Sequence, residues 1–379
     1  MRVAYVCADP GVPAFGTKGA SVHIQEMVRA WRAKGAQVRL YLVRVGDDVP
    51  ADVAEVPVTH VPVAKSADGG TAARERAQRE AAAALAEAVL ADGVDVVHER
   101  YSLFSSALAT ITESSSAVGL LEVNAPLIEE QATHRELVDV EGADRALQTQ
   151  AGAADRVLAV SEPVSAWVRG RVPSARVVVT PNGVDPQRVR AVRHDPEDTP
   201  TVVFVGTLKP WHGVEHLLEA AALARRPWRV RIVGDGPQAP RLRARAAELG
   251  LDVDFRGAVR PADVPAQLQG AHVAVAPYPD GQDQYFSPLK VLEYSAAALP
   301  VVASDVGQLG DLVHDGVTGL LVPPSDPAAL AAAVDGLVSV PERAERMGSA
   351  GRRRMLRQHT WGHVLDRAVD GLELVEEPT

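Results

Sequence analysis

The chain has 379 residues, 46% of them hydrophobic and 23% charged, which is typical of a soluble globular protein large enough for two domains. Its formal net charge of −10 argues against nonspecific nucleic-acid binding, which needs a basic surface. A single cysteine, Cys7, excludes an internal disulfide, and no run approaches the ~20 apolar residues of an integral membrane segment. The N-terminus does not resemble a signal peptide, so we expect a cytoplasmic protein.

The first predicted element is a buried strand at residues 2–7, followed by a loop and a helix that ends at Gly35. A second apolar strand spans residues 37–43, and this strand–loop–helix–strand order implies parallel pairing. The loop contains Gly16 and Gly19, which let backbone N–H groups approach a phosphate closely where a helix begins. Because the G-x-G-x-x-G spacing of dinucleotide-binding loops is absent, this signal is weak by itself.

Further strands are predicted at residues 95–98, 118–122, 156–161 and 176–180, with helices at 71–92, from about 126 and at 161–171. Ligands of open α/β sheets bind just beyond the carboxyl ends of the strands. Glu122 and Asn124 are well placed for such a site, whereas His98 at the end of its strand is more often a hydrogen-bonded structural residue. His98 beside a single glutamate does not predict a metal site, because metal ligands come in threes or fours.

An acidic run follows the strand at 118–122, with carboxylates at Glu122, Glu129, Glu130, Glu136, Asp139, Glu141 and Asp144. Two interpretations stay open: a solvated acidic helix face, which is the commoner case, or a surface that attracts a cationic substrate. In the second interpretation Glu122, Asn124 and Glu129 bind the substrate, because they lie nearest the strand end.

Residues 186–199 are charged, contain proline and lack periodicity, as expected of a linker between a domain at 1–185 and a domain at 200–358. A strand, a glycine loop and a helix restart at residue 201, and further strands are expected near 231–237, 253–259 and 272–276. The second half therefore predicts a second parallel α/β domain of Rossmann-like type. Terminal helices are expected between about 341 and 374, the last of them within 359–379.

The stretch at 276–307 predicts a helix with Ser287 as N-cap and Pro288 as its first residue. Lys290 then lies in the first turn, where the positive end of the helix macrodipole makes a cation cost about 0.3–1 kcal/mol. A bound phosphate would reverse that cost, since free N–H groups and the lysine would converge on one charge. Glu293 would lie over the same end and accept hydrogen bonds from paired hydroxyls. The alternative is a solvated helix with Lys290 and Glu293 as an i,i+3 pair.

The segments SPLK, VLEYSAAALPVVASDVG and DLVHDGVTGLLVPPSDP (287–327, with a short gap) resemble the donor-binding region of family 4 retaining glycosyltransferases with the GT-B fold. The resemblance covers nearly the whole chain, from FGTKG through PNGVD to HTW. It implies two Rossmann-like domains facing across a cleft, with the acceptor in the first, the nucleotide sugar in the second, and a C-terminal helix that crosses back. It also implies metal-independent, retaining transfer with no cofactor besides the nucleotide-sugar co-substrate, which we expect to be a UDP-sugar.

In that family two glutamates with seven residues between them bind the sugar donor. The second contacts the ribose hydroxyls, and Glu293 matches it. Tyr285 stands where the first glutamate, which contacts the transferred sugar, is expected. Asp283 is a candidate replacement carboxylate, although a loop aspartate is more often a turn residue.

Relatives also carry an arginine directly after the glycine of the second domain's first loop and a lysine five residues later. Thr207 and His212 occupy these places, so we assign the phosphate-binding cation to Lys209 between them. Lys209, Lys290 and the helix terminus that includes Ser287 and Leu289 are expected to stabilise the departing diphosphate in place of a metal ion. At the strand end near the acceptor, where relatives carry His-x-His, the resemblance makes His98 and Arg100 catalytic candidates.

The segments FGTKGASVHIQE and LLEVNAPLIEEQA resemble glycosyltransferases of aminoglycoside-antibiotic pathways, which implies a small hydrophilic acceptor such as an amino sugar or aminocyclitol. Alternatives are a transferase acting on a cell-envelope glycan or lipid-linked acceptor, a sugar-nucleotide epimerase, and a non-catalytic nucleotide-sugar-binding protein. The sequence names neither the sugar and acceptor nor the oligomeric state.

Overall fold

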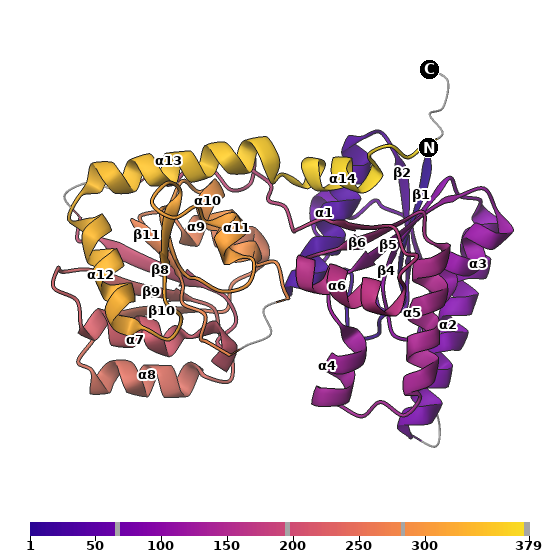
Figure 1. The fold of residues 1–379 in the computed structure, drawn as a ribbon, viewed down its shortest axis with the longest axis horizontal. Helices are drawn as coiled ribbons and strands as arrows, with labels where there is room; N and C mark the ends of the chain where they lie inside the picture. The colour runs from indigo at the N-terminus through magenta and orange to yellow at the C-terminus, as the bar shows by residue number, and fades with distance from the viewer. Residues whose placement is uncertain (65–68, 194–197, 282–284, 375–379) are drawn as a thin grey trace. The chain divides into compact units, whose positions relative to one another are not determined.

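The computed structural model describes residues 1–64, 69–193, 198–281 and 285–374, which form two compact units (Figure 1). The N-terminal unit holds residues 1–182, the short segment Tyr285–Ser287 and the chain from Trp361 onward. The C-terminal unit holds two segments, Gly183–Gln284 and Pro288–Thr360. Both units are parallel α/β structures, which confirms the predicted fold class.

The N-terminal unit is built on a seven-stranded parallel sheet in the order β3-β2-β1-β4-β5-β6-β7. The strands are β1 (Arg2–Cys7), β2 (Gln37–Leu42), β3 (Val58–His60), β4 (Val96–Arg100), β5 (Val118–Val123), β6 (Arg156–Ala159) and β7 (Val177–Val179). The helices between them are α1 (Gly19–Ala33), α2 (Thr71–Asp92), α3 (Ala107–Ser114), α4 (Leu127–His134), α5 (Val140–Ala153) and α6 (Glu162–Arg171), with a 3₁₀ turn at Ala51–Val53. Strand order reverses between β1 and β4, and the carboxyl ends of strands at such a switch point are where α/β proteins bind ligands.

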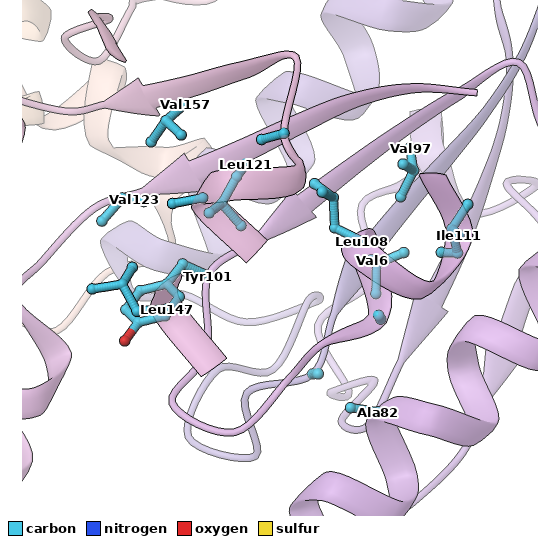
Figure 2. Packing of buried hydrophobic residues seen from close by; sticks show 14 of the residues in the cluster. Val6, Ala82, Val97, Tyr101, Leu108, Ile111, Leu121, Val123, Leu147 and Val157 are labelled. Carbon is cyan, nitrogen blue, oxygen red and sulfur yellow. The ribbon is translucent and has the colours of Figure 1, made fainter. Parts of the chain in front are cut away.

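Alternation along these strands sends neighbouring side chains to opposite faces of the sheet. On one face Val97 and Leu121 pack with Leu108 of α3 and Leu147 of α5 in a dry aliphatic core (Figure 2). On the other face lies α1, which also contacts α14 (Trp361–Val369). Because α14 packs in the N-terminal unit, the structure agrees with the prediction that the C-terminal helix crosses back to the first domain.

The C-terminal unit is built on a six-stranded parallel sheet in the order β10-β9-β8-β11-β12-β13. The strands are β8 (Thr201–Val205), β9 (Arg229–Val233), β10 (Val253–Gly257), β11 (Val273–Ala276), β12 (Val301–Ser304) and β13 (Gly319–Val322). The helices are α7 (Val214–Ala222), α8 (Ala239–Glu248), α9 (Val264–Gln267), α10 (Leu289–Ala296), α11 (Leu309–Leu312), α12 (Pro327–Val338) and α13 (Pro341–Gln358), with 3₁₀ turns at Pro210–His212 and Pro261–Asp263. Here the strand order reverses between β8 and β11.

The start of α10 differs from the prediction. The helix begins at Leu289, and Pro288 is its N-cap residue without a side-chain capping bond. Ser287 instead accepts a hydrogen bond from the Asn182 backbone N–H at 3.1 Å. Because Ser287 uses its hydroxyl in the N-terminal unit, it does not cap the helix that follows.

Candidate functional site

Glu122, at the end of β5, is the centre of a buried polar cluster in the N-terminal unit, with only 3% of its surface exposed. Its Oε1 accepts hydrogen bonds from Arg100 at 2.6 Å and from the Asn124 amide. Its Oε2 accepts a hydrogen bond from the Tyr5 hydroxyl at 3.0 Å and lies 2.9 Å from Nε2 of His23. Both carboxylate oxygens are therefore occupied by groups of the protein itself.

Burial alone would raise the pKa of Glu122, but its neighbours reverse the effect. The charge of His23, hydrogen bonds from His23 and His98, and the guanidinium of Arg100 together hold the pKa of this carboxyl well below its ordinary value. Glu122 is thus an ionised hub that orients its neighbours. The contact with an acceptor that we expect from the sequence stays a prediction.

His98 is fully buried on β4, where its protonation can be assigned from its neighbours. Nδ1 lies 3.1 Å from Nε1 of Trp31, and an indole N–H can only donate, so Nδ1 must accept. The ring proton of the neutral imidazole then sits on Nε2, which lies 3.3 Å from Oε2 of Glu122. The cluster fixes both the orientation and the tautomer of His98.

His23 of α1 and Tyr5 of β1 are members of the cluster that sequence reasoning did not identify. The Nε2 of His23 lies 2.9 Å from Oε2 of Glu122, and its Nδ1 lies 2.7 Å from Oδ1 of Asn182. The Asn182 amide is oriented by its Nδ2, which donates to the Ser287 carbonyl at 2.8 Å. Both ring nitrogens of His23 therefore face oxygen atoms that can accept a hydrogen bond.

A sequence signal for His23 existed. Residue 23 precedes Met27 by four positions and Trp31 by eight, so it lies on the apolar face of α1. A polar residue on a buried helix face needs a partner. The sequence around Asn182 indicates only a turn, and the two long-range contacts of this residue have no local signal.

The acidic run is largely neutralised within the N-terminal unit. Glu129 forms an ion pair with Arg171 and accepts a hydrogen bond from Nε1 of Trp167 at 2.8 Å. Further along, Asp139 pairs with Arg79. The acceptor contact predicted for Glu129 would therefore compete with an internal cation, and it stays a prediction.

The predicted donor-binding residues fall in both units. Tyr285 and Ser287 belong to the N-terminal unit, where the Tyr285 hydroxyl hydrogen bonds to Oε1 of Glu130. Gly16 lies in the loop before α1, and the exposed Gly19 is the first residue of that helix. Asp283 lies outside the described residues.

In the C-terminal unit, the predicted phosphate-binding residues gather around the loop that follows β8. Lys209 is half-buried, with its Nζ 4.5 Å from the centre of the Trp211 ring, while Thr207 is exposed. The loop is braced by backbone bonds, among them Leu208 N to the Asp235 carbonyl at 3.0 Å. Lys209 thus lies at the carboxyl end of β8, beside the switch point of the sheet.

Lys290, in the first turn of α10, is 91% buried rather than solvated, because only 9% of it is exposed. Its Nζ lies 4.2 Å from the centre of the Phe204 ring and 5.3 Å from that of Tyr278. A Cβ on Gly206 would lie 2.7 Å from this Nζ, so the ammonium reaches the glycine that ends β8. Burial lowers the pKa of Lys290 to about 7, and Glu293 offsets part of that effect.

His212, which stands where relatives carry a lysine, is a neutral group. Its Nδ1 donates to the Thr207 carbonyl, which can only accept, and its ring lies between those of Phe204 and Tyr278. Burial, and then the charges of Lys290 and Lys209, lower the pKa of His212 to about 3. The structure thus brings together two lysines and one uncharged histidine at this strand end.

Glu293 is half-buried one turn beyond Lys290, and Leu289 is the first residue of the same helix. Among the described residues, no group of three or more His, Cys, Asp and Glu side chains is arranged to hold a metal ion. None of the described helices is long and apolar enough to cross a membrane.

Comparison with known proteins identifies the family. A family model described as Glycosyltransferase Family 4 matches residues 17–188, and one described as Glycosyl transferases group 1 matches residues 199–339. A D-inositol 3-phosphate glycosyltransferase from Geodermatophilus obscurus is 30% identical across 95% of this chain and 85% of its own length. The chain belongs to glycosyltransferase family 4.

Other relatives of this glycosyltransferase are matched over shorter lengths. The alpha-maltose-1-phosphate synthase of Mycolicibacterium smegmatis is 30% identical across 59% of this chain and 64% of its own length. The alpha-D-kanosaminyltransferase of Streptomyces kanamyceticus is 34% identical across 41% of this chain and 40% of its own length. The chain spans less than two thirds of these two relatives.

Solved structures show the same GT-B fold. HepE of Anabaena in complex with UDP has a TM-score of 0.72 at 17% identity, covering 98% of this chain and 99% of that one. Sucrose-phosphate synthase of Thermosynechococcus elongatus has a TM-score of 0.70 at 21% identity, covering 96% of each chain.

Proposed function

We propose that this glycosyltransferase moves a sugar from a nucleotide-diphosphate sugar to a small hydrophilic acceptor, with retention of configuration and without a metal ion. The observation that carries the proposal is the buried Nζ of Lys290 at the end of β8, where the described residues offer it no hydrogen-bond partner. A buried ammonium in this state suits a site that is completed by an anion.

The chemistry requires the glycosidic bond to the diphosphate to break while negative charge grows on the leaving oxygen. Lys290 and Lys209 would meet that charge, and the free N–H groups at the start of α10 would add to them. We further propose that the acceptor hydroxyl attacks from the face that the diphosphate leaves. HepE of Anabaena was solved in complex with UDP, which supports a UDP-sugar as the first donor to test.

Incubation with UDP-, GDP-, ADP- and dTDP-sugars and a panel of acceptors tests the proposal, with NMR reading the anomeric configuration of the product. We expect transfer with retention, at an unchanged rate in the presence of a chelator. A product with inverted configuration would refute retention. Transfer that a chelator abolishes would refute metal independence. Nucleotide-sugar binding without transfer or hydrolysis would instead favour a non-catalytic binding protein.

Glu293 is proposed to accept hydrogen bonds from the ribose hydroxyls. Glu293→Ala should weaken binding of the nucleotide sugar by about 1–3 kcal/mol, because it removes a partner for buried hydroxyls. Isothermal titration calorimetry measures this change, and Glu345→Ala, on the exposed face of α13, is the matched control. An unchanged Kd for Glu293→Ala would contradict the proposal that Glu293 binds the ribose hydroxyls.

The acceptor is proposed to be a small amino sugar or aminocyclitol, a choice supported by the similarity to a kanosaminyltransferase. Near the carboxyl ends of the strands, the carboxyl group of Glu130 has no ion pair within 4 Å among the described residues, whereas Glu129 is neutralised by Arg171. Efficient transfer to neutral or lipid-linked acceptors, with amines inert, would favour the cell-envelope alternative.

If a cationic acceptor is attracted by carboxylates that have no ion pair in the protein, Glu130→Gln should raise the KM for a polyamine acceptor several-fold at low salt. Glu129→Gln should change it less, because its charge is already compensated. Initial rates at low and physiological ionic strength provide the measurement, since salt screens the attraction. Equal effects of both substitutions, or no salt dependence, would contradict the charge-based recognition.

A further inference from the structure

The described neighbours of Lys290 in the C-terminal unit come from its own helix, from β8 and the loop after it, and from the end of β11. On its own helix, Glu293 lies one turn along, and its charge acts on Lys290. From the loop after β8 come Lys209 and His212, and the charges of both lysines lower the pKa of His212. From the end of β11 comes the ring of Tyr278, and from β8 that of Phe204.

Two other helices, α11 and α13, pack on α10. The acidic residue of α11 is Asp311, but the carboxylate whose charge acts on Lys290 is that of Glu293. Arg352 of α13 donates to the Ala296 carbonyl, which lies at the opposite end of α10 from Lys290. The ring faces of Phe204 and Tyr278 attract a cation weakly, but they accept no conventional hydrogen bond from it. The described residues thus give an ammonium here no hydrogen-bond partner, which leaves water or a ligand to pair with it, or else deprotonation.

The protonation of Lys290 changes near neutral pH, whereas that of His212 and Tyr278 does not. Burial sets the pKa of Lys290 at about 7, that of His212 at about 3, and that of Tyr278 above its ordinary value. A dianionic diphosphate beside Nζ would raise the Lys290 pKa, because an opposite charge favours the ammonium.

We propose that this site takes up one proton from solvent when it binds the diphosphate of the sugar donor, and that the lone pair of the Lys290 Nζ receives it. The inference rests on the proposed function. Its physical basis is the buried Nζ between two aromatic rings, for which the described residues provide no hydrogen-bond partner. The neutral His212 fits this scheme, because a third cation in its place would oppose protonation of Lys290.

The sign of the coupling follows from linkage. Above the pKa of the free site, ligand binding requires a proton, so the Kd should rise with pH by up to about tenfold per unit. Proton uptake should be small at pH 6, about half a proton at pH 7 and close to one at pH 8.5. In the absence of ligand, the free energy of unfolding should rise with pH above 7, since the unfolded chain keeps its lysine protonated there.

Calorimetry in buffers of different ionisation enthalpy at each pH counts the protons taken up. The probes are UDP-glucose, GDP-mannose, ADP-glucose and dTDP-glucose, whose diphosphates are esterified at both ends and do not titrate near neutral pH. The tightest binder is then used with Lys290→Arg, which cannot lose its charge, and with Lys290→Met, which has none. Lys209→Met is the matched control and should retain the uptake.

Uptake by the wild type and by Lys209→Met, but by neither Lys290 variant, would support the proposal. Binding without uptake, or with equal uptake in Lys290→Arg, would overturn it and leave the proposed function standing. If none of the four nucleotide sugars binds, the proposed function fails and the inference fails with it.

Discussion

Replacing Lys290 by methionine should lower the turnover of sugar transfer by about 10²–10³-fold, the usual loss for one charge-stabilising group in an active site. The reason is that the diphosphate would lose the cation that we place beside the leaving oxygen. The free energy of unfolding of the ligand-free protein should be unchanged or higher, because the substitution removes a buried amine that has no hydrogen-bond partner among the described residues. Steady-state kinetics and urea unfolding on the same preparation measure both quantities.

Lys34→Met is the matched control for this experiment. Lys34 forms an ion pair with Asp366 at 2.5 Å in the N-terminal unit, with side chains that are 37% and 57% exposed. Its loss should leave turnover unaltered and stability nearly so. Normal turnover in Lys290→Met, together with a large loss of stability, would assign Lys290 a structural role instead.

Replacing Glu122 by glutamine should destabilise the protein by about 3–5 kcal/mol, the cost of leaving a buried charge without its partner. Arg100 and His23 would lose the carboxylate that they share, while the shape of the side chain would hardly change. Urea unfolding at pH 7 measures the loss. Glu141→Gln, whose carboxylate and its partner Arg145 are 89% and 66% exposed, is the control and should have little effect.

The pH dependence provides a second test of Glu122. Because its pKa is lowered in the folded protein, its contribution to stability is complete above the ordinary glutamate pKa of about 4.3 and is lost as pH falls through the folded value. The difference between wild type and Glu122→Gln should therefore stay constant from pH 5 to 8 and shrink below about pH 4. A difference that is small at pH 7 would contradict the role of Glu122 as an ionised hub.

The periodicity of the chain predicted both parallel sheets because buried parallel strands are continuous apolar runs. Short elements were harder to predict from the sequence. Examples are β3 and α3, which are three and eight residues long. The helix dipole singled out Lys290 as unusual, but the sequence left a solvated first turn open as an alternative. Its burial depends on Phe204 and Tyr278, which come from two other strand ends and have no local relation to residue 290.

The polar cluster of the N-terminal unit likewise depends on contacts between segments that are distant in the sequence. Glu122 was singled out by its place at a strand end, but its partner His23 comes from a helix far away in the chain, and Asn182, which contacts His23, comes from a distant loop. Spacing within one segment cannot predict such contacts. The pairing of Glu129 with Arg171, 42 residues apart, likewise has no signature in the acidic run.

The most direct test of the central claim is a crystal structure of this glycosyltransferase with a nucleotide-diphosphate sugar. We expect a phosphate oxygen within about 3 Å of the Lys290 Nζ, a second cationic contact from Lys209, and the ribose hydroxyls on Glu293. A diphosphate bound elsewhere, with the Lys290 Nζ still enclosed between Phe204 and Tyr278 and without an anion, would contradict the claim.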